Sequence, residues 1–108
     1  MYKKIKSKKD ISLLFKNGLY IKSSKFLLIH KKNNLNINRF AILVSKKNGS
    51  AVFRNRLKRV YREVFRENLE IDSCFLDILM RPNIGSSADY ITIKKEFIKC
   101  QKKLKKYY

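Results

Sequence analysis

Hydrophobic and polar residues recur along the chain with two different periods, and these periods predict helices and strands. Three segments show the helical period of about 3.6 residues, with apolar residues at i, i+3 and i+4. They predict helices over residues 8–17, 51–68 and 89–106. Capping residues support these boundaries, because Ser7 precedes the first segment, Gly18 follows it, and Ser50 precedes the second.

Three further segments are rich in Ile, Leu, Phe and Val, a composition typical of strands. These segments cover residues 20–32, 39–46 and 74–80. Ser23-Ser24 divides the first segment into a short strand and a longer one. The asparagine-rich spacer 33–38 favours a turn, so an antiparallel pair between the first two segments is expected. Arg81-Pro82 ends the third strand.

The order of these elements (helix, strands, helix, strand, helix) predicts one α+β domain over residues 1–108, with helices packed on a sheet. A chain of 108 residues fits one domain, and its 44% hydrophobic content can form a core. Asp77 interrupts the apolar third strand and is expected to face an edge or to form a salt bridge. Cys74 and Cys100 lack CxxC spacing, so both are expected to be ordinary core thiols.

The charge of the chain adds a functional constraint. The formal net charge is +19, from 27 Lys and Arg against 8 Asp and Glu. Like charges at this density destabilise a compact state, which indicates a polyanionic partner. No apolar run approaches the ~20 residues of a membrane-spanning helix, and the basic opening lacks the apolar region of a signal peptide. We therefore expect a cytoplasmic protein with a nucleic-acid partner and no membrane partner.

The predicted helix over residues 51–68 separates apolar and basic residues on two faces. At about 100° per residue, one arc contains Phe53, Leu57, Val60, Tyr61 and Val64. The neighbouring arc contains Arg54, Asn55, Lys58, Arg59, Arg62 and Arg66, with Arg56 at its far flank. Arginine suits bidentate phosphate contacts. Because Glu63 and Glu67 are too few to pair with this row, we expect the basic face to bind phosphates rather than to form salt bridges along the helix.

The residues indicate no catalytic centre within the chain itself. The single histidine, His30, lies beside two lysines in a predicted strand and is expected at a strand end. The eight acidic residues show no metal-ligand spacing. We therefore expect a nucleic-acid-binding module with no cofactor of its own. RNA is favoured over DNA because a sheet flanked by a basic helix can stack single-stranded bases.

The motifs of the basic region resemble the family of protein subunits of bacterial ribonuclease P. The resemblance rests on Val44-Ser45-Lys46-Lys47, Gly49, Ala51-Val52, Arg54-Asn55-Arg56, Lys58-Arg59 and Arg62-Glu63. It extends over nearly the whole chain through Lys4-Ile5-Lys6 with Asp10, Phe15-Lys16-Asn17-Gly18 and Arg81-Pro82. The resemblance implies an α-β sandwich in the order αβββαβα with a left-handed βαβ crossover, where general rules favour a right-handed one.

The resemblance further implies a ribonucleoprotein that removes 5′ leaders from precursor tRNA. In this family the RNA subunit is the catalyst and holds the Mg²⁺ ions, so the implied partners are the ribonuclease P RNA and precursor tRNA. The protein is expected to raise substrate affinity and to lower the Mg²⁺ requirement. A structural RNA-binding protein of the ribosomal type is the main alternative, and a DNA-packing protein is the next.

Two sets of contact residues are implied by the same resemblance. The RNA-binding set is Lys46, Lys47, Arg54, Asn55, Arg56, Lys58, Arg59 and Arg62. A cleft between the basic helix and the sheet is expected to hold the leader, lined by Phe15, Phe26, Ile11 and Ile29. Ile11 and Ile29 stand where some relatives place aromatic residues, so base stacking of about 1–3 kcal/mol per base is expected to be reduced.

Overall fold

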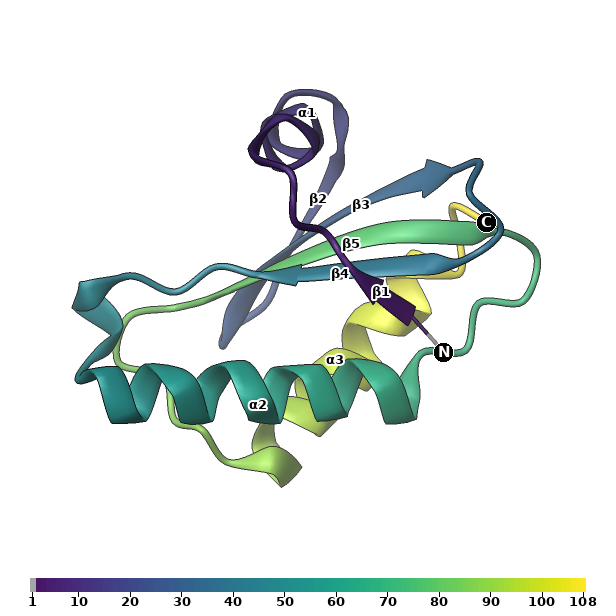
Figure 1. Cartoon of the computed structure of the whole chain (residues 1–108). Helices are drawn as coiled ribbons and strands as arrows, with labels where there is room; N and C mark the ends of the chain where they lie inside the picture. Colours follow the sequence, from purple (N-terminus) through teal and green to yellow (C-terminus); the bar gives the residue numbers. More distant parts are fainter. Residues whose placement is uncertain (1) are drawn as a thin grey trace.

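The computed structural model describes residues 2–108, which form five strands, three α-helices and one short 3-10 helix. In chain order these are β1 (Tyr2–Lys4), α1 (Lys8–Asn17), β2 (Leu19–Lys22), β3 (Phe26–Asn33), β4 (Asn38–Ile42), η1 (Lys46–Asn48), α2 (Ala51–Asn68), β5 (Phe75–Pro82) and α3 (Tyr90–Leu104). The strands form one mixed sheet in the order β1-β4-β5-β3-β2. Helices α2 and α3 cover one face of the sheet, and α1 lies over the other (Figure 1). The expected α+β architecture is confirmed.

Local sequence determines where the helices begin. Helices α1 and α2 span the predicted residues. The Ser7 and Ser50 hydroxyls accept hydrogen bonds from the backbone N–H groups of Asp10 (3.3 Å) and Phe53 (3.2 Å). These bonds satisfy donors in the first turn that no helical carbonyl can reach. Helix α3 is shorter than predicted at both ends, and Asp89 serves as its N-cap.

The predicted antiparallel pair between residues 20–32 and 39–46 is wrong. Strands β3 and β4 both pair with β5, which lies between them, antiparallel to β3 and parallel to β4. A long apolar strand is stable in this central position, where both edges are hydrogen-bonded and both faces are covered. The first segment instead divides at Ser23-Ser24 into the antiparallel β2–β3 pair. The second ends early at Ile42, and Lys46–Asn48 forms η1.

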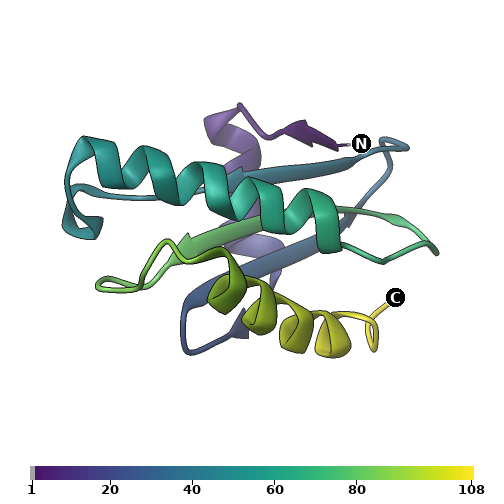
Figure 2. The ribbon, with the colours of Figure 1, turned by 90° about the horizontal axis from the view of Figure 1, so that it is seen from below.

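Strand β1 was not predicted and adds an element ahead of the expected αβββαβα order. It pairs in parallel with β4. Figure 2 views the sheet from the side of α2 and α3, with β4 above β5 and both strands running to the left. The chain passes from β4 through α2, in front of the sheet, to β5. This connection is left-handed, as the family resemblance implies and against the general preference.

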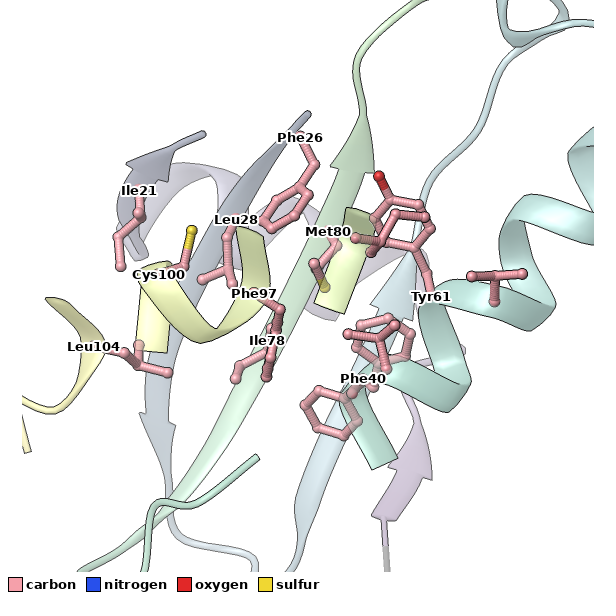
Figure 3. Packing of buried hydrophobic residues seen from close by; sticks show 14 of the residues in the cluster. Ile21, Phe26, Leu28, Phe40, Tyr61, Ile78, Met80, Phe97, Cys100 and Leu104 are labelled. Atoms are coloured by element: carbon pink, nitrogen blue, oxygen red, sulfur yellow. The ribbon is translucent and has the colours of Figure 1, made fainter. Parts of the chain in front are cut away.

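Two apolar clusters lie on the two faces of the sheet, because alternate side chains of a strand point to opposite faces. Figure 3 shows the larger cluster, between the sheet and helices α2 and α3. Within it Phe26 packs edge-on against Tyr61 (5.8 Å between ring centroids), and Phe40 stacks on Phe65 (4.5 Å). The smaller cluster lies beneath α1 and contains Ile5, Leu14, Leu27, Ile29, Ala41 and Leu79.

The cysteines and the histidine belong to the packed interior. Cys100 is buried in the larger cluster, Cys74 packs against it, and both thiols are free. His30 does not lie at a strand end as expected, because it is buried in the middle of β3 with its Nδ1 2.7 Å from the Tyr108 hydroxyl. Burial lowers the pKa of His30 and raises the pKa of Tyr108 to about 12, so this pair is neutral at pH 7.

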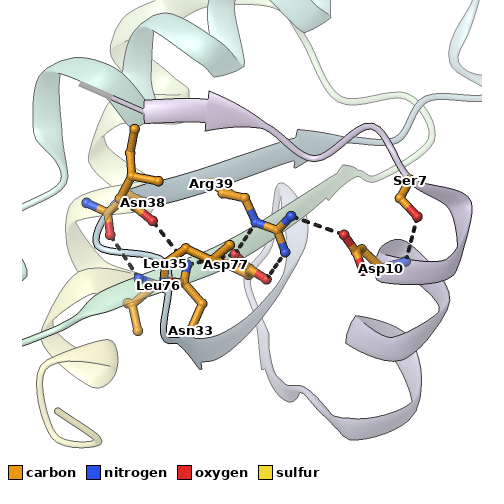
Figure 4. Close-up of polar contacts among 9 residues, drawn as sticks. Ser7, Asp10, Asn33, Leu35, Asn38, Arg39, Leu76 and Asp77 are labelled. Atoms are coloured by element: carbon orange, nitrogen blue, oxygen red, sulfur yellow. Dashed lines mark hydrogen bonds and ion pairs between the residues drawn. The ribbon is translucent and has the colours of Figure 1, made fainter.

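Asp77 is the centre of an ion network on the α1 face of the sheet (Figure 4). Arg39 of β4 donates from Nε and Nη2 to the two carboxylate oxygens of Asp77, at 2.9 and 2.7 Å. Its Nη1 donates to Asp10 of α1 at 3.1 Å, and Asn33 donates to Asp77 at 2.8 Å. Hydrogen bonding to Asp77 above all, together with Asp10, raises the pKa of Arg39 although burial opposes it. The predicted salt bridge therefore joins two strands to α1.

Gly18→Ala is expected to destabilise the protein by about 1–3 kcal/mol, the usual cost of overpacking. Gly18 has an ordinary φ of −75°, so its backbone does not require glycine. A Cβ there would lie 2.5 Å from Cγ2 of Ile29 and 2.5 Å from the Leu14 carbonyl oxygen. Urea unfolding measures the loss, with Ser12→Ala at an exposed position of α1 as the near-neutral control. Equal stability of the glycine variant and the wild type would contradict this close approach.

Asp77→Ala is expected to cost about 3 kcal/mol of unfolding free energy, because it leaves a largely buried guanidinium without its main partner. The Asp77 side chain is 12% exposed, whereas the Asp10 side chain is 37% exposed. Asp10→Ala is therefore the matched comparison and should cost about 1 kcal/mol or less. Chemical unfolding of both variants measures the difference, and equal losses would show that Asp77 is not the dominant partner of Arg39.

Candidate nucleic-acid interface

Helix α2 keeps its basic side chains away from the apolar face that docks on the sheet. The buried residues of the helix are Leu57, Val60, Tyr61, Val64 and Phe65. Among the predicted RNA-binding residues of this helix, Asn55, Arg56 and Arg59 are exposed, and Arg54, Lys58 and Arg62 are half-buried. The predicted separation of charge from burial is confirmed, with Phe65 buried in addition and Phe53 only half-buried.

The positive charge of α2 is not neutralised by acidic side chains. None of the salt bridges among residues 2–108 involves a basic residue of this helix. Glu67 instead accepts a hydrogen bond from the Tyr90 hydroxyl at 2.8 Å. Arg62 donates from Nε to the Lys58 carbonyl at 3.2 Å, which directs the side chain along the helix without removing its charge. Because like charges on one helix face repel, a phosphate-bearing ligand would lower the electrostatic energy of this surface.

A groove lies beside β4, where α1 and α2 approach the same strand; we call it the β4 groove. It has a volume of about 240 Å³ and is lined by Lys4, Ile5, Ile11, Phe40, Ala41, Ile42, Leu43, Lys58 and Arg62. The groove is open because β1 pairs with β4 only at Asn38–Phe40 and leaves the rest of that strand edge uncovered. Lys58 and Arg62 form a cationic wall next to apolar side chains, which is a surface suited to a single-stranded polyanion.

The β4 groove continues toward η1, which carries Lys46 and Lys47 at exposed positions. A second hollow of about 420 Å³ lies between η1 and the end of β5, and it shares Leu43 with the groove. The Asn48 side chain holds η1 in place, because its Oδ1 accepts from the Ser45 N–H (2.9 Å) and its Nδ2 donates to the Pro82 carbonyl (3.4 Å). The two lysines are therefore fixed beside the amino end of α2, whose dipole adds positive potential.

Of the four residues predicted to line the leader cleft, two are partly exposed and two are buried in the structure. Ile11 lines the β4 groove and is half-buried. Phe15 is also half-buried and packs on the apolar cluster beneath α1, as Leu43 does. These two side chains keep part of their surface available at the α1 side of the sheet. Of the four predicted residues only Ile11 lines the β4 groove, and Phe15 lies outside that lining, packed on the same apolar cluster.

Phe26 and Ile29 do not line an open surface, which corrects the expectation for both. Phe26 is 1% exposed and faces α2 on the opposite side of the sheet, against Tyr61. Ile29 faces α1 but is fully buried in the smaller cluster. The cause is the alternation of side chains along β3 combined with the close approach of α1 at Gly18. Strand residues cannot be assigned to a face before the register and the covering helix are known.

Lys4 was missed as a candidate site residue. It lines the β4 groove from β1, opposite the cations of α2. A strand of three residues carries too little alternation to be recognised in the sequence, so the placement of Lys4 followed only from the pairing of β1 with β4. The match of Lys4-Ile5-Lys6 to the family's opening was the one available signal.

The interface can bind and orient a polyanion, but its side chains assemble no metal centre. Within residues 2–108, no group of three or more His, Cys, Asp or Glu side chains could hold a metal ion. Asp10 and Asp77, the acids closest to the sheet face beneath α1, are engaged by Arg39. Among the described helices, none is long and apolar enough to cross a membrane.

Comparison with known proteins identifies relatives over almost the whole chain. The sequence matches the family Ribonuclease P over residues 2–105. The ribonuclease P protein component of Thermotoga maritima is 30% identical over 106 residues, which cover 94% of this chain and 91% of the relative. That of Macrococcus caseolyticus is 39% identical over 98 residues, covering 88% and 85%. These relatives support neither the ribosomal nor the DNA-packing alternative.

Solved structures share the fold. The ribonuclease P protein of Thermotoga maritima has a TM-score of 0.81 at 29% identity, covering 94% of this chain and 96% of that chain. The Staphylococcus aureus protein has a TM-score of 0.78 at 27% identity, with 97% of each chain covered. The match in sequence, the shared fold and the uncompensated basic helix agree with one another. The chain therefore belongs to the bacterial ribonuclease P protein family.

Proposed function

We propose that this chain, as the protein subunit of ribonuclease P, binds the catalytic RNA with the basic face of α2 and η1, and the 5′ leader of precursor tRNA in the β4 groove. The observation that carries the proposal is the uncompensated cationic row of α2, which borders a groove with an apolar floor. Phosphates suit the cationic wall, and single-stranded bases suit the apolar floor.

The protein contributes binding and orientation, and the RNA subunit contributes the chemistry of 5′ leader removal. In this proposal the Mg²⁺ ions are held by the RNA subunit. Arginine and lysine side chains of α2 reduce the repulsion between the phosphates of the two RNAs, a task that Mg²⁺ otherwise performs. The protein thereby lowers the Mg²⁺ concentration that the holoenzyme requires, and the proposal places it in the cytoplasm with its precursor substrates.

Selectivity for precursor over mature tRNA follows from the position of the groove. Arg62 belongs both to the basic face of α2 and to the wall of the β4 groove, so one side chain borders both proposed RNA sites. Only a precursor has a leader to occupy the groove. Because Phe26 and Ile29 are buried, leader contact depends on Phe15, on apolar contacts at Ile11, and on cations.

The experiment that tests this function adds the purified protein to the ribonuclease P RNA of its own organism, with labelled precursor tRNA at low Mg²⁺. The protein is expected to stimulate 5′ cleavage. In the same assay Phe15→Ala should weaken precursor binding by about 1–3 kcal/mol, the contribution of one stacked base, and leave leaderless tRNA unaffected. Absence of stimulation at every Mg²⁺ concentration would reject the function. Equal losses for both substrates would reject only the assignment of Phe15 to the leader.

Arg59→Ala is expected to weaken binding to the catalytic RNA and to reduce the slope of log K against log salt by about one. Arg59 is exposed on α2 and forms no salt bridge within the described chain, so its loss removes a phosphate contact without disturbing the core. The matched control is Lys99→Ala, which removes one charge from a lysine already paired with Glu96. The slopes are obtained from binding measured at several salt concentrations. Identical slopes for the two variants would show that Arg59 does not contact the RNA.

A further inference from the structure

A second basic and aromatic hollow lies at the sheet edge opposite the β4 groove. It has a volume of about 550 Å³ and is lined by Tyr20, Ile21 and Lys22 of β2 and by Lys103, Lys106 and Tyr107 at the end of α3. We call it the β2 pocket. Strand β2 is the outermost strand on this side, so β3 and β5 separate the pocket from β4. None of these residues belongs to the interface described above.

The two tyrosines of the β2 pocket are exposed and held in position. Tyr20 is 46% exposed and Tyr107 is 53% exposed, so both rings offer surface to a ligand. The Tyr20 hydroxyl donates to the Phe15 carbonyl at 2.6 Å, and the Tyr107 ring packs against His30 with 4.9 Å between centroids. The Tyr20 ring lies on the α1 face of the sheet and the Tyr107 ring on the α3 face, so the two rings flank the β2 edge from opposite sides. Both are ordered before a ligand binds, which reduces the entropy lost on binding.

The three lysines of the β2 pocket carry uncompensated charge. None of the salt bridges found between residues 2 and 108 involves Lys22, Lys103 or Lys106. Neighbouring lysines of the same region do find acidic partners, since Lys105 pairs with Glu70 at 3.6 Å and Lys99 with Glu96. The free charge of these three lysines is shared with most basic residues of the chain, and what distinguishes the pocket is their position around a hollow that also contains aromatic residues.

A helix dipole accounts for only part of this arrangement. Lysines near the carboxyl end of α3 stabilise the helix, and this explains Lys103 without any ligand. It does not explain Lys22, which comes from a strand on the other side of the pocket, or the two exposed tyrosines. The combination of aromatic platforms with surrounding cations is the arrangement that binds single-stranded nucleic acid, because bases stack and phosphates pair with ammonium groups.

We propose that the β2 pocket binds single-stranded RNA that passes around the β2 edge, with bases stacked on Tyr107 at the α3 face and on Tyr20 at the α1 face, and with phosphates held by the three lysines. This inference rests on the proposed function and extends it to a second RNA contact. Tyr20 connects the two sites, since its hydroxyl holds the carbonyl of Phe15, the aromatic residue assigned to the leader. In the sheet, β2 lies three strand spacings, about 15 Å, from β4.

Two RNAs have the chemistry to occupy the pocket, and their difference is measurable. One is the distal part of the precursor leader, beyond the nucleotides at Phe15. The other is a single-stranded segment of the catalytic RNA itself. The first source gives an affinity that grows with leader length, whereas the second contributes equally to every substrate and to binding of the catalytic RNA alone.

The test measures equilibrium binding to the reconstituted holoenzyme of precursors with leaders of about 4 and about 16 nucleotides, the range of single-strand binding sites. Tyr107→Ala is expected to reduce affinity for the precursor with the long leader about fivefold or more. The ratio of long-leader affinity to short-leader affinity should fall by the same factor. Tyr107→Phe keeps the stacking surface and should behave as the wild type. Lys22→Ala and Lys106→Ala should each lower the salt slope by about 0.7, the value per phosphate in single strands.

The outcomes separate the two sources and the underlying function. A loss confined to the long leader supports the pocket and assigns it to the leader. A loss in binding of the catalytic RNA alone, restored by Tyr107→Phe, supports the pocket and assigns it to that RNA. The proposal would be overturned if the tyrosine and lysine variants kept wild-type affinities and salt slopes for both leaders and for the catalytic RNA alone. Lys99→Ala is the matched control for the loss of one charge. If the wild-type protein still stimulates cleavage in that case, the proposed function stands. Thermal unfolding of each variant confirms that it is folded.

Discussion

The docking of α2 on the sheet is the interaction on which the rest of this structure depends. The helix carries a row of like charges whose mutual repulsion costs a few tenths of a kcal/mol for each neighbouring pair. Its buried side chains, such as Leu57, Tyr61 and Val64, contribute about 1.5–3 kcal/mol each when removed from water. Burial therefore outweighs repulsion by a wide margin. The helix is stable because its apolar residues are buried on one face and its charged residues stay in solvent on the other.

The same docking determines where the charge is presented. Helix α2 connects two parallel neighbours, β4 and β5, by a left-handed crossover, and this places its basic face beside the open edge of β4. On the other face of the sheet, Arg39 joins Asp77 of β5 to Asp10 of α1. This ion network holds α1, and with it Ile11 on the apolar side of the groove, over the sheet. The docking of α2 separately positions the cationic wall.

The sheet also separates two positively charged edges that differ in chemistry. The edge at β4 combines arginine with aliphatic side chains, whereas the edge at β2 combines lysine with two exposed tyrosines. Phe15 lies between them, packed on the cluster under α1 and bonded through its carbonyl to Tyr20. The net charge of +19 is spread over much of the chain, including exposed lysines on α1 and β3, and at these two edges it lies next to a hollow.

The sequence by itself determined the helices, the caps at Ser7 and Ser50, and the division of α2 into an apolar and a basic face. These features depend on residues within a few positions of one another, so periodicity and capping rules are sufficient. The insertion of β5 between β3 and β4, the pairing of β1, and the burial of Phe26 and Ile29 were decided only by the tertiary structure. Strand order and the face of each strand residue depend on partners that are distant in the chain, and a shift of one residue exchanges the two faces. The groove and the β2 pocket exist only where such distant segments meet.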